Sequence, residues 1–67
     1  MKYSYELNGS YNNYPIKTRK FKTLSAANHA LDQIILDKDL EVSYVINKEN
    51  ASTYVVNDYS RFIIERI

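Results

Sequence analysis

The segment Thr23–Leu40, TLSAANHALDQIILDKDL, decides the fold, because it is the one stretch with a sustained helical period. Its apolar residues recur at three- and four-residue intervals, which places them along one stripe of a 3.6-residue helix. That stripe consists of Leu24, Ala27, Leu31, Ile34 and Ile35. Thr23 or Ser25 can cap the first turn with a side-chain oxygen. We therefore predict a helix over about residues 24–37, ending near Asp37 or Lys38.

Residues 2–8 alternate between apolar and polar side chains, which is typical of a half-buried strand. In residues 16–22 neither side is cleanly apolar, as expected for a strand at a sheet edge. We predict strands at residues 2–8 and 16–22. The Asn8-Gly9 pair is a turn signal, because both residues tolerate positive φ. A tight hairpin at Asn8-Gly9 and a looser loop that runs to Pro15 are both possible. We favour the looser loop, because the alternation resumes only near Tyr14 and proline suits the first residue of a strand.

The segments after the helix also indicate strands, at residues 41–48, 52–56 and 58–67. In the first of these, Val42, Tyr44 and Ile46 share one face. Residues 58–67 also fit a helix that begins at Asp58, but the β-branched and aromatic residues favour a strand. The resulting order is ββαβββ, which predicts a two-layer α+β fold: an antiparallel meander of four or five strands with the helix on one face. We expect residues 1–67 to form a single small domain.

Composition excludes several classes of protein. The chain has 67 residues, no cysteine and a net charge of +1. No disulfide or zinc thiolate is possible, and a general attraction to nucleic acid or membrane is not expected. No apolar run exceeds three residues, so we expect neither a signal peptide nor a membrane span, and a cytoplasmic location. The high content of Asn, Lys, Ile and Tyr hints at an AT-rich genome, such as that of a phage or mobile element.

Catalytic and cofactor-binding motifs are absent from the sequence. His29, the single histidine, falls on the outer face of the predicted helix, where a general base would lack an orienting partner. One glycine cannot build a phosphate-binding loop. The acidic stretch around Asp37 and Asp39 lacks the glycine and ligand spacing of a calcium loop. We predict a protein that is not an enzyme and that has no cofactor or metal.

The charges are separated along the chain, and they define a first candidate interaction surface. Residues 1–22 carry a net charge of +4 and residues 23–41 a net charge of −3. Four cations fall within residues 16–22, as expected for an edge strand that resists pairing. The first surface comprises Lys17, Arg19, Lys20 and Lys22 with Tyr11 and Tyr14. Cations beside aromatic side chains fit either a protein partner or nucleic acid, since phosphates pair with cations and bases stack on rings.

The outer stripe and acidic end of the helix form the second candidate surface, which comprises His29, Gln33, Leu36, Asp37 and Asp39. Leu36 suggests that the helix ends early or that something covers it, and a homodimer would do so while supporting a small core. A single exposed leucine is also normal in a soluble protein. Our leading hypothesis is a small, non-enzymatic cytoplasmic protein that binds another protein. The alternatives are nucleic-acid binding through residues 17–22 and a homo-oligomeric structural protein.

Overall fold

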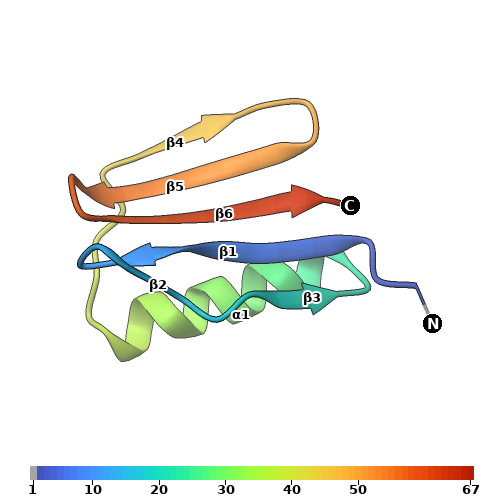
Figure 1. Cartoon of the computed structure of the whole chain (residues 1–67), viewed down its shortest axis with the longest axis horizontal. Coiled ribbons are helices and arrows are strands. Elements are labelled where there is room, and N and C mark those ends of the chain that lie inside the picture. The colour runs from blue at the N-terminus through green and yellow to red at the C-terminus, as the bar shows by residue number, and fades with distance from the viewer. Residues whose placement is uncertain (1) are drawn as a thin grey trace.

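A computed structural model, which describes residues 2–67, shows one helix packed against a six-stranded antiparallel sheet (Figure 1). This arrangement confirms the predicted two-layer α+β class. The helix, α1, spans Leu24–Asp37, as predicted. The strands are β1 (Tyr5–Tyr11), β2 (Tyr14–Pro15), β3 (Arg19–Phe21), β4 (Tyr44–Asn47), β5 (Ala51–Asn57) and β6 (Ser60–Arg66). Of the second predicted strand, residues 16–22, only Arg19–Phe21 forms a strand, and β2 lies in the segment that was predicted as a loop.

The strand order differs from the predicted meander. Strands β2 and β3 both pair with the same side of β1, and the order continues through β6 and β5 to β4. The first and last strands of the chain therefore pair at the centre of the sheet. The chain reaches one edge at β3 and passes along α1 before it enters the opposite edge at β4. In Figure 1, α1 lies beside β1 and β3, and β4 is the strand farthest from it.

The first hairpin turns later than predicted. Strand β1 runs straight through Asn8-Gly9, and the chain reverses at Asn12-Asn13, where φ is 51° and 69°. Two consecutive left-handed residues are the requirement of the type I′ turn that matches strand twist, and asparagine tolerates this conformation. The predicted loose loop to Pro15 was therefore wrong. Gly9 has a different use: its φ is +144°, and it lies where the backbone of β6 approaches closely.

The cationic segment forms an edge strand, as predicted. Between Ser10↔Pro15 and Leu7↔Arg19 the edge carries one residue more than β1, so the strand bulges at residues 16–18. The amide of Ile16 still donates to the carbonyl of Gly9, at 3.0 Å. A bulge interrupts the flat row of backbone groups that another strand needs for pairing.

Both ends of α1 are held by specific hydrogen bonds. Thr23 is the N-cap, and its Oγ1 accepts from the amide of Ala26 at 3.1 Å. At the other end the amide of Asp39 donates to Leu36 and the amide of Leu40 donates to Ile35, the two bonds of a Schellman motif. Asp39 has φ 51° and occupies the position that glycine usually takes. This role accounts for a carboxylate at the unfavourable end of the helix dipole.

The core lies between α1 and the centre of the sheet. Its buried members are Leu7, Ala27, Ala30, Leu31, Val56, Phe62 and Ile64. Ala27 and Ala30 let the helix approach the sheet closely, while Ile34 and Ile35 pack at its margin. Leu24, predicted to lie on the inner stripe, is 47% exposed at the first residue of the helix.

The structure also separates three residues that were predicted to share one face, Val42, Tyr44 and Ile46. Val42 packs against the core, but Tyr44 and Ile46 lie on the face of the sheet away from α1. The reason is a bulge at the start of β4. Ser43 donates its amide to Val55, although Tyr44 is the residue paired with Val55. Because Ser43 and Tyr44 both lie opposite Val55, the side chains no longer alternate between the two faces, and Val42 points toward the core.

Gly9→Ala should destabilise the fold strongly, by at least about 2 kcal/mol, because a Cβ at this position meets the β6 backbone and the φ is unfavourable for alanine. A Cβ there would lie 2.8 Å from the Cα of Phe62 and closer still to the carbonyl oxygen of Arg61. Urea denaturation followed by circular dichroism measures the change. Ser10→Ala on the same strand is the control and should change stability little. Equal stability of the two variants would contradict the prediction.

Asp39→Gly should stabilise the protein by about 0.5–1 kcal/mol, because glycine adopts the left-handed conformation without steric cost. Asp37→Gly is the matched control. It places glycine inside the last helical turn and should destabilise by about 0.5–1 kcal/mol. Thermal denaturation of both variants tests the pair, and shifts of the same sign in both would contradict our assignment of the helix end.

Candidate functional site

Strand β4 is an exposed strand at one edge of the sheet. All its residues are exposed, and Tyr44, Val45 and Ile46 keep 57%, 41% and 42% of their surface accessible. It pairs with β5 on one side, and within residues 2–67 no strand occupies its other side. The helix contacts β1, β3 and β6, so neither face of β4 is covered by it. An apolar strand is therefore open on its edge and on both faces.

The outer edge of β4 presents unpaired backbone groups in a regular pattern. Lys48 donates its amide to Ala51, and in an antiparallel ladder such hydrogen-bonded pairs alternate with non-bonded ones. Tyr44 and Ile46 therefore direct their backbone groups toward β5. Val45 and Asn47 direct their N–H and C=O groups outward. This row of donors and acceptors is the template that strand addition uses.

Side chains fix the register of β4 on β5 at both ends. Ser43 donates its hydroxyl to the carbonyl of Val56 at 2.7 Å. Ser52 donates its hydroxyl to the Asn47 side-chain oxygen at 2.9 Å, across the directly opposed pair. The edge is consequently a defined surface, because a slip by one residue would lose both bonds and exchange the two faces.

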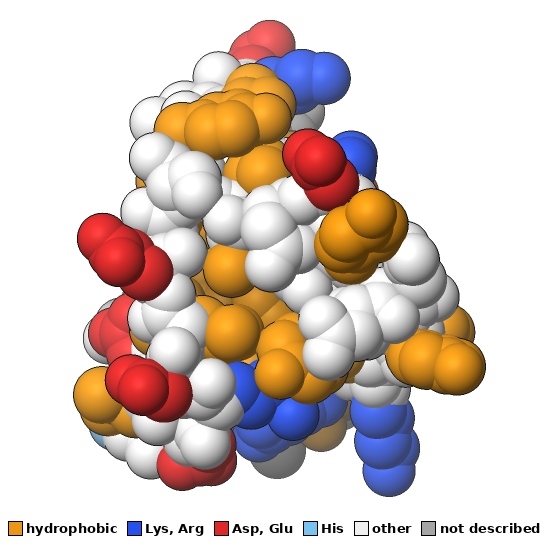
Figure 2. Space-filling view, turned by 90° about the vertical axis from the view of Figure 1, so that its left-hand side faces the viewer, with side chains coloured by type: hydrophobic (Ala, Val, Ile, Leu, Met, Phe, Trp, Pro, Cys, Tyr) orange, Lys and Arg blue, Asp and Glu red, His pale blue; other side chains and the backbone are white. Residues whose placement is uncertain are grey.

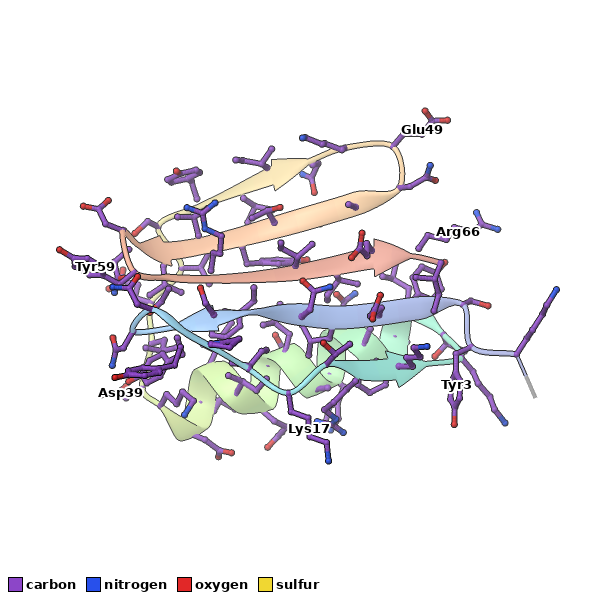
Figure 3. The ribbon with its side chains drawn as sticks, in the orientation of Figure 1. Tyr3, Lys17, Asp39, Glu49, Tyr59 and Arg66 are labelled. Carbon is purple, nitrogen blue, oxygen red and sulfur yellow. The ribbon has the colours of Figure 1, made fainter. Side chains whose placement is uncertain are left out.

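The first surface predicted from the sequence lies on the opposite edge of the sheet. Lys17, Arg19, Lys20 and Lys22 are all exposed there, and Figure 3 shows Lys17 pointing away from the sheet. The cations do not share a face, since Arg19 opposes Leu7 of the core face and Lys20 opposes Glu6 of the other. Arg19 stacks 5.1 Å from the centre of the Phe21 ring. Cations on both faces protect the edge against pairing with another strand. They also divide the positive charge between the two faces of the sheet.

Tyr11 and Tyr14 close the same hairpin but differ in their surroundings. The two residues form the last pair of β1 and β2. Tyr14 is exposed, whereas Tyr11 is half-buried under Lys38, whose Nζ lies 4.4 Å from the ring centre. Tyr11 thus anchors the C-terminal end of α1 to the sheet through a cation–π contact. Only part of the predicted first surface is available to a partner.

The second predicted surface lies on the outer side and the C-terminal end of α1. His29, Gln33, Leu36, Asp37 and Asp39 are exposed, and the helix does not end before Leu36, which keeps 70% of its surface accessible. In Figure 3, Asp39 lies at the same end of the molecule as Tyr59, and Arg66 lies at the other. Figure 2 looks onto the Asp39 end and shows acidic side chains along one margin.

A shallow groove lies between the start of α1 and the outer strands. Leu24 and Asn28 form one wall, Ser52 and Tyr54 of β5 the other, and Ile64 contributes to the floor. Its volume is about 210 Å³. Pockets that bury a cofactor or a drug-sized ligand usually measure about 300–1,000 Å³. The groove therefore adds contact area beside β5 but is smaller than a typical cofactor site.

The described residues contain no metal-binding cluster and no helix that could span a membrane. No group of three or more His, Asp or Glu side chains within residues 2–67 could hold a metal ion. Over the same range, α1 is neither long nor apolar enough to cross a bilayer. His29 stands exposed on the outer side of the helix, as predicted.

Comparison with known proteins gives no family assignment, since no family model, curated protein or solved structure matches the chain.

Sequence reasoning missed the β4 edge as a site. A signal was present: Tyr44-Val45-Ile46 is an apolar run without a charge, proline or glycine, unlike the cationic segment at residues 16–22. In a central strand such a run would be buried on both faces. The strand order, which the sequence did not give, turns the same run into an exposed edge.

Proposed function

We propose that this protein is a non-enzymatic binding protein that takes up another polypeptide chain by strand addition at β4. The observation that carries the proposal is the contrast between the two edges of the sheet. The β2–β3 edge has a bulge, Pro15 and four cations in and beside it. Strand β4 contains no charged residue and no proline, and its bulge lies before the strand, at Ser43. Natural sheets protect edges against unwanted pairing, so an unprotected apolar edge indicates a binding site.

The two faces of β4 would supply the side-chain contacts. Tyr44 and Ile46 continue onto Thr53 and Val55 of β5 on the face away from α1. Val45 lies beside Tyr54 on the other face, next to the groove. Main-chain hydrogen bonds would provide affinity and the alternating side chains would provide specificity, as in other strand-addition complexes. A cytoplasmic location is part of the proposal, in keeping with the lack of cysteine.

Nucleic-acid binding through the cationic edge is the alternative proposal. It is supported by the exposure of the four cations and of Tyr14 at one edge. It is weakened by the division of Arg19 and Lys20 between two faces, since a phosphate backbone tracks a continuous positive surface.

Val45→Pro should abolish capture of the protein partner, because it removes an outward amide without removing a bond to β5. Affinity capture from an extract of the native host tests this, with Val45→Thr as the matched control. Threonine keeps the amide and the shape of valine and should retain the partner. Capture of the same partner by Val45→Pro, with its fold verified by circular dichroism, would refute strand addition at β4.

A gel-shift titration over salt concentration separates the two proposals. For a β4-binding protein we expect no complex with single- or double-stranded nucleic acid, even at low salt. If the cationic edge binds nucleic acid, a complex will form at low salt, weaken steeply with salt, and be lost with Lys17→Glu plus Lys20→Glu. That pattern would establish the alternative.

A further inference from the structure

We infer that the chain added at β4 is a second copy of this protein, in an antiparallel pair with Ile46 on the two-fold axis. The inference rests on the proposed strand addition at β4 and specifies its occupant and register. Two sheets would join there into one continuous sheet.

The backbone of β4 selects the register. Outward N–H groups are available at Val45 and Asn47, whereas the amide of Ser43 is already donated to Val55. An axis at Ile46 places Val45 opposite Asn47 of the second copy, so both outward residues exchange both of their hydrogen bonds. An axis at Val45 would place Asn47 opposite Ser43, whose amide already donates to Val55. The bulge at Ser43 therefore favours the Ile46 register over one centred on Val45.

The side chains of β4 complement one another in this register. Ile46 meets Ile46 of the second copy in a non-hydrogen-bonded pair, the closer of the two antiparallel pairings. Tyr44 lies opposite Lys48 of the second copy on the same face, and this places a cation beside an exposed ring. The two-fold axis repeats the contact. An apolar centre is thus flanked on both sides by a ring and a cation.

Closure of the edges gives a second argument for a copy of the same chain. A β4 pair uses both apolar edges and leaves the two cationic β2–β3 edges at the ends of the joined sheet. Those ends resist further addition through Pro15, the bulge and the cations. Pairing of β4 with the β2–β3 edge of another copy would instead produce an open filament. The protected edge prevents that outcome.

Single-cysteine variants test the register directly, since the natural chain contains no cysteine. Ile46→Cys places two thiols in a directly opposed pair with Cα atoms about 4.5 Å apart, within disulfide range. Under mild oxidation we expect nearly complete conversion to a covalent dimer. Tyr44→Cys is the matched control: the two copies of residue 44 would lie about 14 Å apart along the strands, too far to bond. Equal cross-linking of both variants, or none of Ile46→Cys, would overturn the register.

Light scattering tests the dimer itself. We expect a mass of about twice the chain's 7.9 kDa for the natural protein and for Leu36→Glu, and one chain mass for Val45→Pro. A monomeric natural protein at high concentration would overturn the dimer. If Val45→Pro nevertheless loses partner capture, strand addition stands and the occupant is a different chain. A dimer dissolved by Leu36→Glu but not by Val45→Pro would place the interface on α1 and overturn the inference.

Discussion

The width of a single α-helix limits how much of this sheet can be covered. A helix with its side chains is about 10 Å wide and neighbouring strands are about 4.8 Å apart, so one helix covers two to three strands. Here α1 covers β3, β1 and β6, whereas β5 and β4 extend beyond it (Figure 1). The burial of Leu7 and Phe62, the exposure of β4 and the groove beside β5 all follow from this geometric limit.

Local signals in the sequence predicted the elements well, because they are set by neighbours along the chain. The stripe through Ala27 and Leu31, the Thr23 cap and the cations of the edge strand all have short-range causes. The misassigned features depend on contacts between distant segments. Gly9 resembles a turn residue until β6 lies against it, and the position of Val42 depends on a bulge opposite Val55. Strand order also depends on contacts between distant segments. For this reason the sequence did not predict that β4 lies at an edge of the sheet.

The two edges of the sheet differ: the β2–β3 edge carries cations and a proline, whereas the β4 edge is apolar. This difference is the main support for the proposed binding function. The charge separation seen along the chain has a structural counterpart: the cations protect an edge, and Asp39 ends a helix. Both are accounted for by the fold. What the fold leaves unexplained is the apolar strand Tyr44–Asn47, whose exposure offers the small core no stabilisation. A chain of this size has little stability to spare, so surface of this kind is expected to have a binding role.

The central position of the β1–β6 pair has a consequence for synthesis of the protein. Tyr5 pairs with Arg66, and the amide of Ile67 donates to the carbonyl of Ser4, so the middle of the sheet joins opposite ends of the chain. Such long-range pairing slows folding, because a large loop must close before its contacts are gained. While β6 remains inside the ribosome, Leu7 and the inner stripe of α1 lack the strand that buries them. The β1–β6 pair, and the core that it completes, can therefore form only after β6 has left the ribosome.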